Sequence, residues 1–201
     1  GLLAQNRSLG EDAALVNTSF GINSSREPFQ GSTPVFTARI DTDAGTGTLT
    51  SDTAYSISAR VESIRAYNDE ISAIAPYDLL LSWGKITDGS LESSLTWEQA
   101  ERQGMVSGSL RAADASELNA AYIISHVSNS HVIAANDDIL SGLASIRPGD
   151  TVRIDGRLVD LKMSTGSRYL QVYTSKSRFD QGAGACEIIY VENLRVNDRT
   201  Y

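Results

Sequence analysis

The chain of 201 residues is long enough to bury a sizeable hydrophobic core, in one domain or in one domain with an appendage. Its 17 basic and 25 acidic residues give a net charge of −8, which opposes general binding of nucleic acids. A single cysteine, Cys186, excludes an intrachain disulfide and multi-cysteine zinc sites, and no apolar run approaches the roughly 18 residues of a transmembrane helix.

The first half of the chain predicts an arm followed by strands. The first 33 residues are rich in Ser, Asn and Gly and lack sustained periodicity, which predicts an extended arm. A strand is expected over 35–40 and a turn over 41–47. From Tyr55 apolar and polar residues alternate, which is typical of a half-buried strand, and a change of parity after Val61 indicates a bulge.

The middle of the chain is less regular. Alternation over 77–83 predicts a second long strand, and 121–125 is expected to form another. Between them, residues 88–120 fit either a short helix or a strand around Trp97. The sequence therefore does not decide between a helix and a strand for residues 88–120.

The clearest helix is predicted over 137–146. Asn136 is a good N-cap, acidic residues open the first turn, and the apolar residues fall on one face. Three further strands follow the helix. They are expected at 151–161, 169–174 and 186–191, with a bend near Gly156 and a hairpin turn at 164–167.

Three strands, a helix and two strands are the order of an OB-fold barrel. We therefore predict a mainly β fold with one short helix, arranged as an OB-like closed or partly open β-barrel over residues 55–201. Residues 1–54 are expected to form an N-terminal arm with one or two strands. The alternative is a β-sandwich with one helix.

Three blocks of sequence resemble an uncharacterised family of bacterial cell-envelope proteins. They lie at 75–84, at 128–136 running on to 149–159, and at 174–187. The last two carry the motifs SNxHxIxAN, GDxVxIxGxLV and TSxxRxDxGxGACE. The resemblance implies one folded unit from about residue 55 and a location outside the cytoplasm, in the periplasm or secreted, but no known activity or cofactor. The chain departs from the family near 97–110, where the expected aromatic-rich segment is missing.

The leading functional hypothesis is a non-catalytic binding or assembly module. A glycine-rich loop at 175–185 carries Arg178 and Asp180, which either shape it around a ligand or pin it through a mutual contact. The expected partner is an unknown protein or a small anionic ligand. His131 is a further candidate for this site.

A small hydrolase-like enzyme is the second hypothesis, in which His131 acts with Asp180 or Glu187 as general acid and base. The sequence carries few residues of catalytic type, so we expect no cofactor and no metal. Odd spacing places His126 and His131 on opposite faces of a strand, which is poor geometry for one metal ion. We expect Cys186 to be a small buried hydrophobic residue.

A basic segment stands out from the acidic chain. Residues 147–178 carry seven basic and three acidic side chains, a net charge of +4. Arg153 and Arg157 are expected to start an exposed positive strip that meets a partner, unless neighbouring carboxylates neutralise it as ordinary ion pairs. Tyr169 and Tyr173 share one strand face, which keeps a polyanion or oligonucleotide binder as a third hypothesis, although the net charge opposes it.

Overall fold

The computed structural model describes residues 3–4, 21–88, 94–109, 118–166, 168–180 and 184–201. With 57% of the described residues in strands and 12% in helices, the chain has the mainly β class that its sequence predicts. In chain order the elements are β1 (Leu3–Ala4), β2 (Phe29–Thr42), β3 (Gly45–Ala66), β4 (Tyr77–Ser82), a 3₁₀ helix (Gly84–Thr87), β5 (Leu95–Ala100), β6 (Gln103–Gly108), α1 (Ala120–Ser125), β7 (Val127–Ala134), α2 (Asp137–Ser145), β8 (Thr151–Thr165), β9 (Arg168–Val172), β10 (Glu187–Val196) and β11 (Arg199–Thr200).

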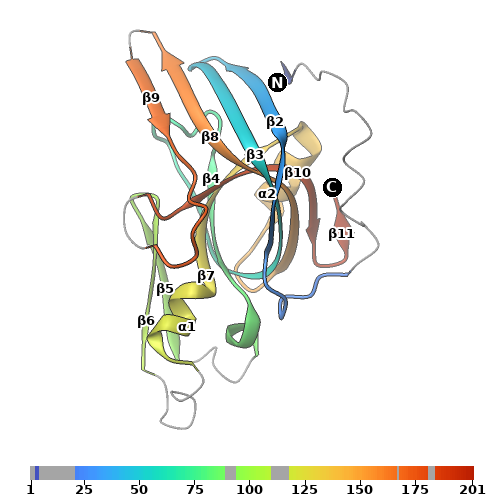
Figure 1. Cartoon of the computed structure of the whole chain (residues 1–201), viewed down its shortest axis with the longest axis vertical. Helices are drawn as coiled ribbons and strands as arrows, with labels where there is room; N and C mark the ends of the chain where they lie inside the picture. The colour runs from blue at the N-terminus through green and yellow to red at the C-terminus, as the bar shows by residue number, and fades with distance from the viewer. Residues whose placement is uncertain (1–2, 5–20, 89–93, 110–117, 167, 181–183) are drawn as a thin grey trace.

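A closed ring of strands forms the centre of the molecule (Figure 1). Within the described residues the ring runs β3–β4–β7–β10–β8 and returns to β3. The pairs are antiparallel except for β7 with β10, which is parallel. Helix α2 lies in the connection between β7 and β8, as the OB-like prediction requires.

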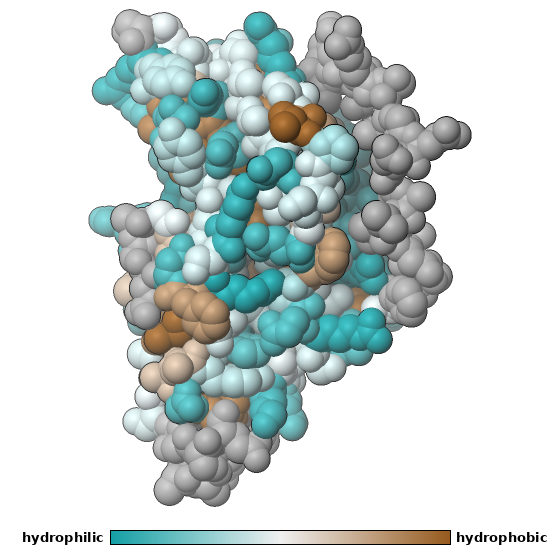
Figure 2. All heavy atoms as spheres, in the orientation of Figure 1, coloured by the Kyte–Doolittle hydropathy of each residue, from teal (hydrophilic) through white to brown (hydrophobic). Residues whose placement is uncertain are grey.

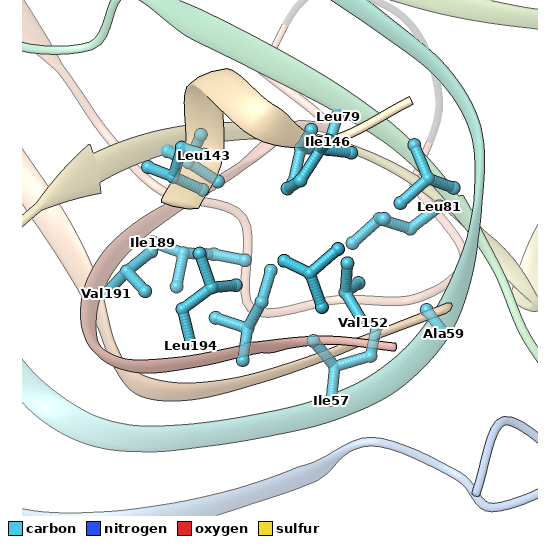
Figure 3. Close-up of a cluster of buried hydrophobic side chains, with 14 of the residues drawn as sticks. Ile57, Ala59, Leu79, Leu81, Leu143, Ile146, Val152, Ile189, Val191 and Leu194 are labelled. Carbon is cyan, nitrogen blue, oxygen red and sulfur yellow. The ribbon is translucent and has the colours of Figure 1, made fainter. Parts of the chain in front are cut away.

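The ring is filled by one hydrophobic cluster, and α2 contributes to it. Alternation along β3 buries Tyr55 and Ile57 inside the ring while the intervening serines are less buried. The helix begins where Asn136 Oδ1 accepts a hydrogen bond from the Ile139 amide at 2.9 Å, and its apolar face places Leu143 in the same cluster. Figure 3 shows side chains of α2 facing those of β3, β8 and β10 across this interior.

Both predicted irregularities of the ring are present. The register between β3 and β4 shifts between Val61 and Ser63, where the parity changes in the sequence. The pairing of β10 with β8 shifts between Val191 and Asn193, next to Gly156. A Cβ atom at Gly156 would lie 2.0 Å from the Tyr190 carbonyl oxygen, so only glycine permits this close approach.

Two flanking strands extend the sheet beyond the ring. At the top of Figure 1, β2 pairs with β3 and β9 pairs with β8, so four strands lie side by side there. A second hydrophobic cluster covers one face of this extension, with Leu49, Leu161 and Ile188 among its buried members. Strand β3 runs without a break across residues 54 and 55, where the sequence suggested the boundary between arm and barrel. The earlier part of the predicted arm, residues 1–2 and 5–20, lies outside the described residues.

The middle of the chain differs from its prediction at one element. Residues 121–125 belong to helix α1 and not to a strand, because Asn119 caps the segment by accepting a hydrogen bond from the Tyr122 amide at 2.9 Å. Around Trp97 the strand alternative is the correct one, since β5 and β6 pair as a hairpin. Residues 89–93 and 110–117 lie outside the described residues. No helix in the described part of the chain is both long and apolar enough to cross a membrane.

Candidate functional site

Polar side chains from neighbouring strands meet on the outer face of the ring. Asp78 on β4 and His131 on β7 occupy directly paired positions, and alternation turns both away from the ring interior, opposite to Leu79 and Val132. Both side chains are buried. His131 Nδ1 lies 2.8 Å from Asp78 Oδ1, an ion-pair distance without the alignment of a hydrogen bond.

The β5–β6 hairpin covers this face and is held there by its turn. Arg102 lies in the turn with a positive φ of 60°. Its guanidinium reaches Asp78 Oδ1 at 2.9 Å and Asp69 Oδ2 at 2.5 Å. Behind the turn, a Cβ atom at Gly104 would come within 2.9 Å of Asn129 Cβ, so the hairpin packs directly against β7. Asp78 therefore faces two cationic side chains, one from the ring and one from the hairpin.

Cys186 lies at the edge of the same cluster, just before β10. Its thiol donates a hydrogen bond to the Arg102 carbonyl oxygen at 3.5 Å and accepts one from Asn129 Nδ2 at 3.6 Å. The thiol also acts electrostatically on the His131 imidazole and raises its pKa. The side chain is partly exposed, so the expected role as a buried hydrophobic residue is wrong. Thiol, imidazole and carboxylate thus belong to one polar cluster.

The electrostatics of the cluster favour a charged imidazole. Burial lowers the pKa of His131, but the contacts with Asp78 and Cys186 outweigh it and raise that pKa to about 9. His131 is therefore protonated at neutral pH. Two buried oxygens in the cluster, Asp78 Oδ2 and Gln99 Oε1, have no hydrogen-bond partner among the described residues.

Glu187 faces the opposite side of the sheet. It shares the parity of Ile189, which lies inside the ring, and its carboxylate accepts a hydrogen bond from the Ser128 hydroxyl. Burial raises the pKa of Glu187 to about 7. The buried hydroxyl of Tyr55, whose own pKa is raised by burial and by Glu187, has no hydrogen-bond partner in the described part of the chain. The structure therefore does not bring His131 and Glu187 together on one face.

The two predicted loop residues contact different partners. Arg178 Nη2 donates to the Pro28 carbonyl oxygen at 2.8 Å, and its guanidinium lies 5.5 Å from the centre of the Trp83 ring. Asp180 accepts a hydrogen bond from the Ser175 hydroxyl at 2.6 Å. The loop is thus pinned through Ser175, where the sequence suggested an Arg178–Asp180 contact. Residues 181–183 of the predicted loop lie outside the described residues.

The predicted positive strip is neutralised by ion pairs. Arg153 Nε lies 3.0 Å from Asp155 Oδ2, and Arg157 Nε lies 2.9 Å from Glu192 Oε1. The other pairs in this region are Lys176 with Asp52 and Arg168 with Glu70. The neutralised alternative is therefore the correct one, and these arginines offer no unbalanced charge to an anionic partner.

Sequence reasoning identified His131 but missed its partners. Asp78, Asn129 and Cys186 all lie in the three blocks described above, and their place in these blocks was the available sequence signal. Within the described residues, no group of three or more His, Cys, Asp or Glu side chains is placed to hold a metal ion. Comparison of the chain with protein-family models, curated proteins and solved structures gives no match.

Proposed function

We propose that the chain is a cysteine-dependent enzyme of the acyl-transfer type, with hydrolysis as its simplest reaction. Cys186 is the nucleophile and His131 transfers the proton. Asp78 orients the imidazole and stabilises its protonated form. The observation that supports this is the cluster itself: Asp78 lies 2.8 Å from the imidazole of His131, the Asn129 amide lies 3.6 Å from the sulfur, and the thiol acts electrostatically on the imidazole. A nucleophile within reach of a base that a third group orients is the general signature of covalent catalysis.

The resting pair of Cys186 and His131 is suited to an ionic form. The contacts with Asp78 and Cys186 raise the pKa of His131 to about 9, so the imidazole is positively charged at neutral pH. A positive charge beside the sulfur favours a thiolate next to an imidazolium. The thiolate is the reactive form of cysteine.

The reaction then follows in two balanced steps. In the first, the Cys186 sulfur bonds to the acyl carbon, the bond to the leaving group breaks, and the leaving group takes the proton of His131. In the second, His131 removes a proton from water, the water oxygen bonds to the acyl carbon, and the carbon–sulfur bond breaks. The products are a carboxylic acid and the protonated leaving group, and the thiolate–imidazolium pair is restored.

Two features of the chain support acyl transfer. Cys186 is the one cysteine in the sequence, so an intrachain disulfide cycle has no second thiol, whereas acyl transfer requires none. In addition, the side-chain amide of Asn129 lies 3.6 Å from the sulfur. An N–H donor at this position is suited to stabilise negative charge on an acyl oxygen.

Alkylation by iodoacetamide tests the reactive thiol. Because the chain has one cysteine, the intact mass reports the modification of Cys186 alone. At pH 6.5 we expect the wild type to react at least about tenfold faster than His131→Gln, since the ion pair preserves the thiolate. The control is His126→Gln, which replaces the other of the two histidines in the chain and leaves the rate unchanged.

Acyl transfer itself is tested with p-nitrophenyl acetate. We expect a burst of nitrophenol and an acetyl group on Cys186 in the intact mass, both abolished by Cys186→Ser. If alkylation follows an ordinary thiol titration and is insensitive to His131→Gln, the proposal is wrong. The cluster is then a structural clamp for the hairpin, and the non-catalytic binding module remains.

A further inference from the structure

Two segments border the approach to Cys186 from solvent. The segment after β9 runs beside it, because the Ser175 amide donates to the Cys186 carbonyl oxygen at 3.0 Å and the Ile188 amide donates to Thr174 Oγ1 at 3.0 Å. The β5–β6 hairpin borders it on the other side, through the contact of the thiol with the Arg102 carbonyl oxygen. A substrate bound at the sulfur would therefore lie next to these two segments.

Both segments expose large hydrophobic side chains. Phe179 is 76% exposed and Tyr173 is 62% exposed on the segment after β9, and Met105 on β6 is 49% exposed. Figure 2 shows hydrophobic atoms gathered on this side of the molecule, over the β5–β6 hairpin. Exposed apolar side chains that gather at one place mark contact sites, since burying them releases free energy.

The charged side chains on the same segment already have hydrogen-bond or ion-pair partners. Lys176 forms an ion pair with Asp52, Arg178 donates to the Pro28 carbonyl oxygen, and Asp180 accepts from the Ser175 hydroxyl. A charged substrate group would have to compete with these contacts, whereas an apolar group could pack against the exposed aromatic rings. The approach to the thiol therefore favours uncharged, apolar groups.

We infer that the acyl group accepted by Cys186 is apolar, either aromatic or a hydrocarbon chain, and that it packs against Phe179 and Tyr173. The substrate class is then an ester or thioester of an apolar acid. The reaction is the one described above, with the same bonds formed and broken. This inference rests on the proposed function and names the substrate class of the same site.

Two maleimides of different polarity test it on the full chain. The rate of Cys186 modification is measured with N-phenylmaleimide and N-methylmaleimide, and each rate is divided by the rate for free cysteine. We expect a normalised ratio of about ten in favour of the phenyl reagent, since part of an aromatic ring is buried on binding. Phe179→Ser and Tyr173→Ser should each lower this ratio severalfold, and Phe179→Leu, which stays apolar, should retain most of it.

The control variant is Val35→Ser. Val35 is 75% exposed and lies on β2, outside the two segments that border the thiol, so its replacement removes an apolar side chain and should leave the ratio unchanged. His131→Gln should lower both rates together and preserve the ratio. Unfolding midpoints in urea verify that each variant is folded.

The outcomes separate this inference from the proposed function. A wild-type ratio near one, or a ratio that the Phe179 and Tyr173 variants leave intact, overturns the apolar substrate class while the fast reaction of the thiol with both reagents persists. If both reagents react as slowly as with an ordinary thiol, the proposed function fails, and the substrate class fails with it.

Discussion

Asp78 and His131 occupy directly paired positions on β4 and β7, and their Oδ1 and Nδ1 atoms lie 2.8 Å apart. The pairing of two strands inside a closed ring fixes this distance more firmly than a loop would. Because Asp78 is fully buried, its charge must be compensated within the protein. Both Arg102 and His131 provide that compensation.

Replacing this carboxylate tests the network directly. Asp78→Asn leaves two cationic side chains without their shared partner, so we expect a loss of about 3–5 kcal/mol in the free energy of unfolding. The pKa of His131 should fall, because burial lowers it and the main opposing contact is gone. Urea unfolding measures the first effect and an NMR titration of the imidazole the second.

Asp69→Asn is the matched control for this variant. Asp69 binds the same guanidinium, but its side chain is 42% exposed. Partly exposed ion pairs contribute about 1 kcal/mol or less, so the variant should remain close to the wild type. Equal losses for the two variants would show that Asp78 acts only by holding the hairpin through Arg102.

The close packing of the hairpin against the ring depends on Gly104. In Gly104→Ala the added methyl group would meet Leu80 Cδ1 at 2.5 Å and Asn129 Cβ at 2.9 Å, so the hairpin must shift. We expect a loss of about 1–3 kcal/mol in stability and slower alkylation of Cys186, since Arg102 and Asn129 both contact the thiol. Gly21→Ala, where the added atom meets nothing within 4 Å, should change neither quantity.

The ring was largely predictable because its strands are half buried. Alternation of apolar and polar residues along 55–61 and 77–83 shows on which face of the strand each side chain lies. The cap at Asn136 marks the start of α2. The segment at 121–125 was mispredicted, because its bulky residues suit a strand while the cap at Asn119 lies before it. The hairpin turn was hidden as well, since Glu101 and Arg102 adopt positive φ without the usual Asn or Gly.

The site was less predictable because its contacts depend on register between distant strands. The alternation along the strand shows that the Arg157 side chain points away from the core. Its ion-pair partner Glu192 lies on another strand, so the sequence pattern does not identify it. In the same way, nothing near His131 in the sequence indicates that Asp78 lies opposite it, since the pairing of β4 with β7 decides this. The glycine-rich loop drew attention to Asp180, whereas the thiol a few residues later lies in the cluster, where it contacts Asn129 and acts on the pKa of His131.

Helix α2 should contribute strongly to stability through one side chain. Leu143 is fully buried inside the ring cluster, so Leu143→Ala should cost about 2–5 kcal/mol. Leu140 on the same helix is only partly buried, and Leu140→Ala should cost less while changing helix propensity equally. Urea unfolding of the two variants gives the comparison, and similar losses would mean that α2 is not tightly packed in the ring.

The last prediction concerns the pH dependence that Glu187 imposes on folding. Its pKa rises from 4.5 to about 7 on folding, so between these values the folded chain binds more protons than the unfolded one. Stability must therefore fall as the pH rises through this window, by on the order of 3 kcal/mol for this group. Glu187→Gln cannot ionise but still accepts the hydrogen bond from Ser128. Its free energy of unfolding should lack this decline and exceed that of the wild type above pH 7, in urea titrations at pH 5, 6, 7 and 8. Glu98→Gln, on the exposed face of the hairpin, should follow the wild-type curve.

His131 contributes a separate decline, since its raised pKa makes stability fall between pH 6.5 and about 9, and this part should persist in Glu187→Gln. Parallel curves for Glu187→Gln and the wild type from pH 5 to 7 would mean that Glu187 is charged inside the folded ring, compensated there by Arg178.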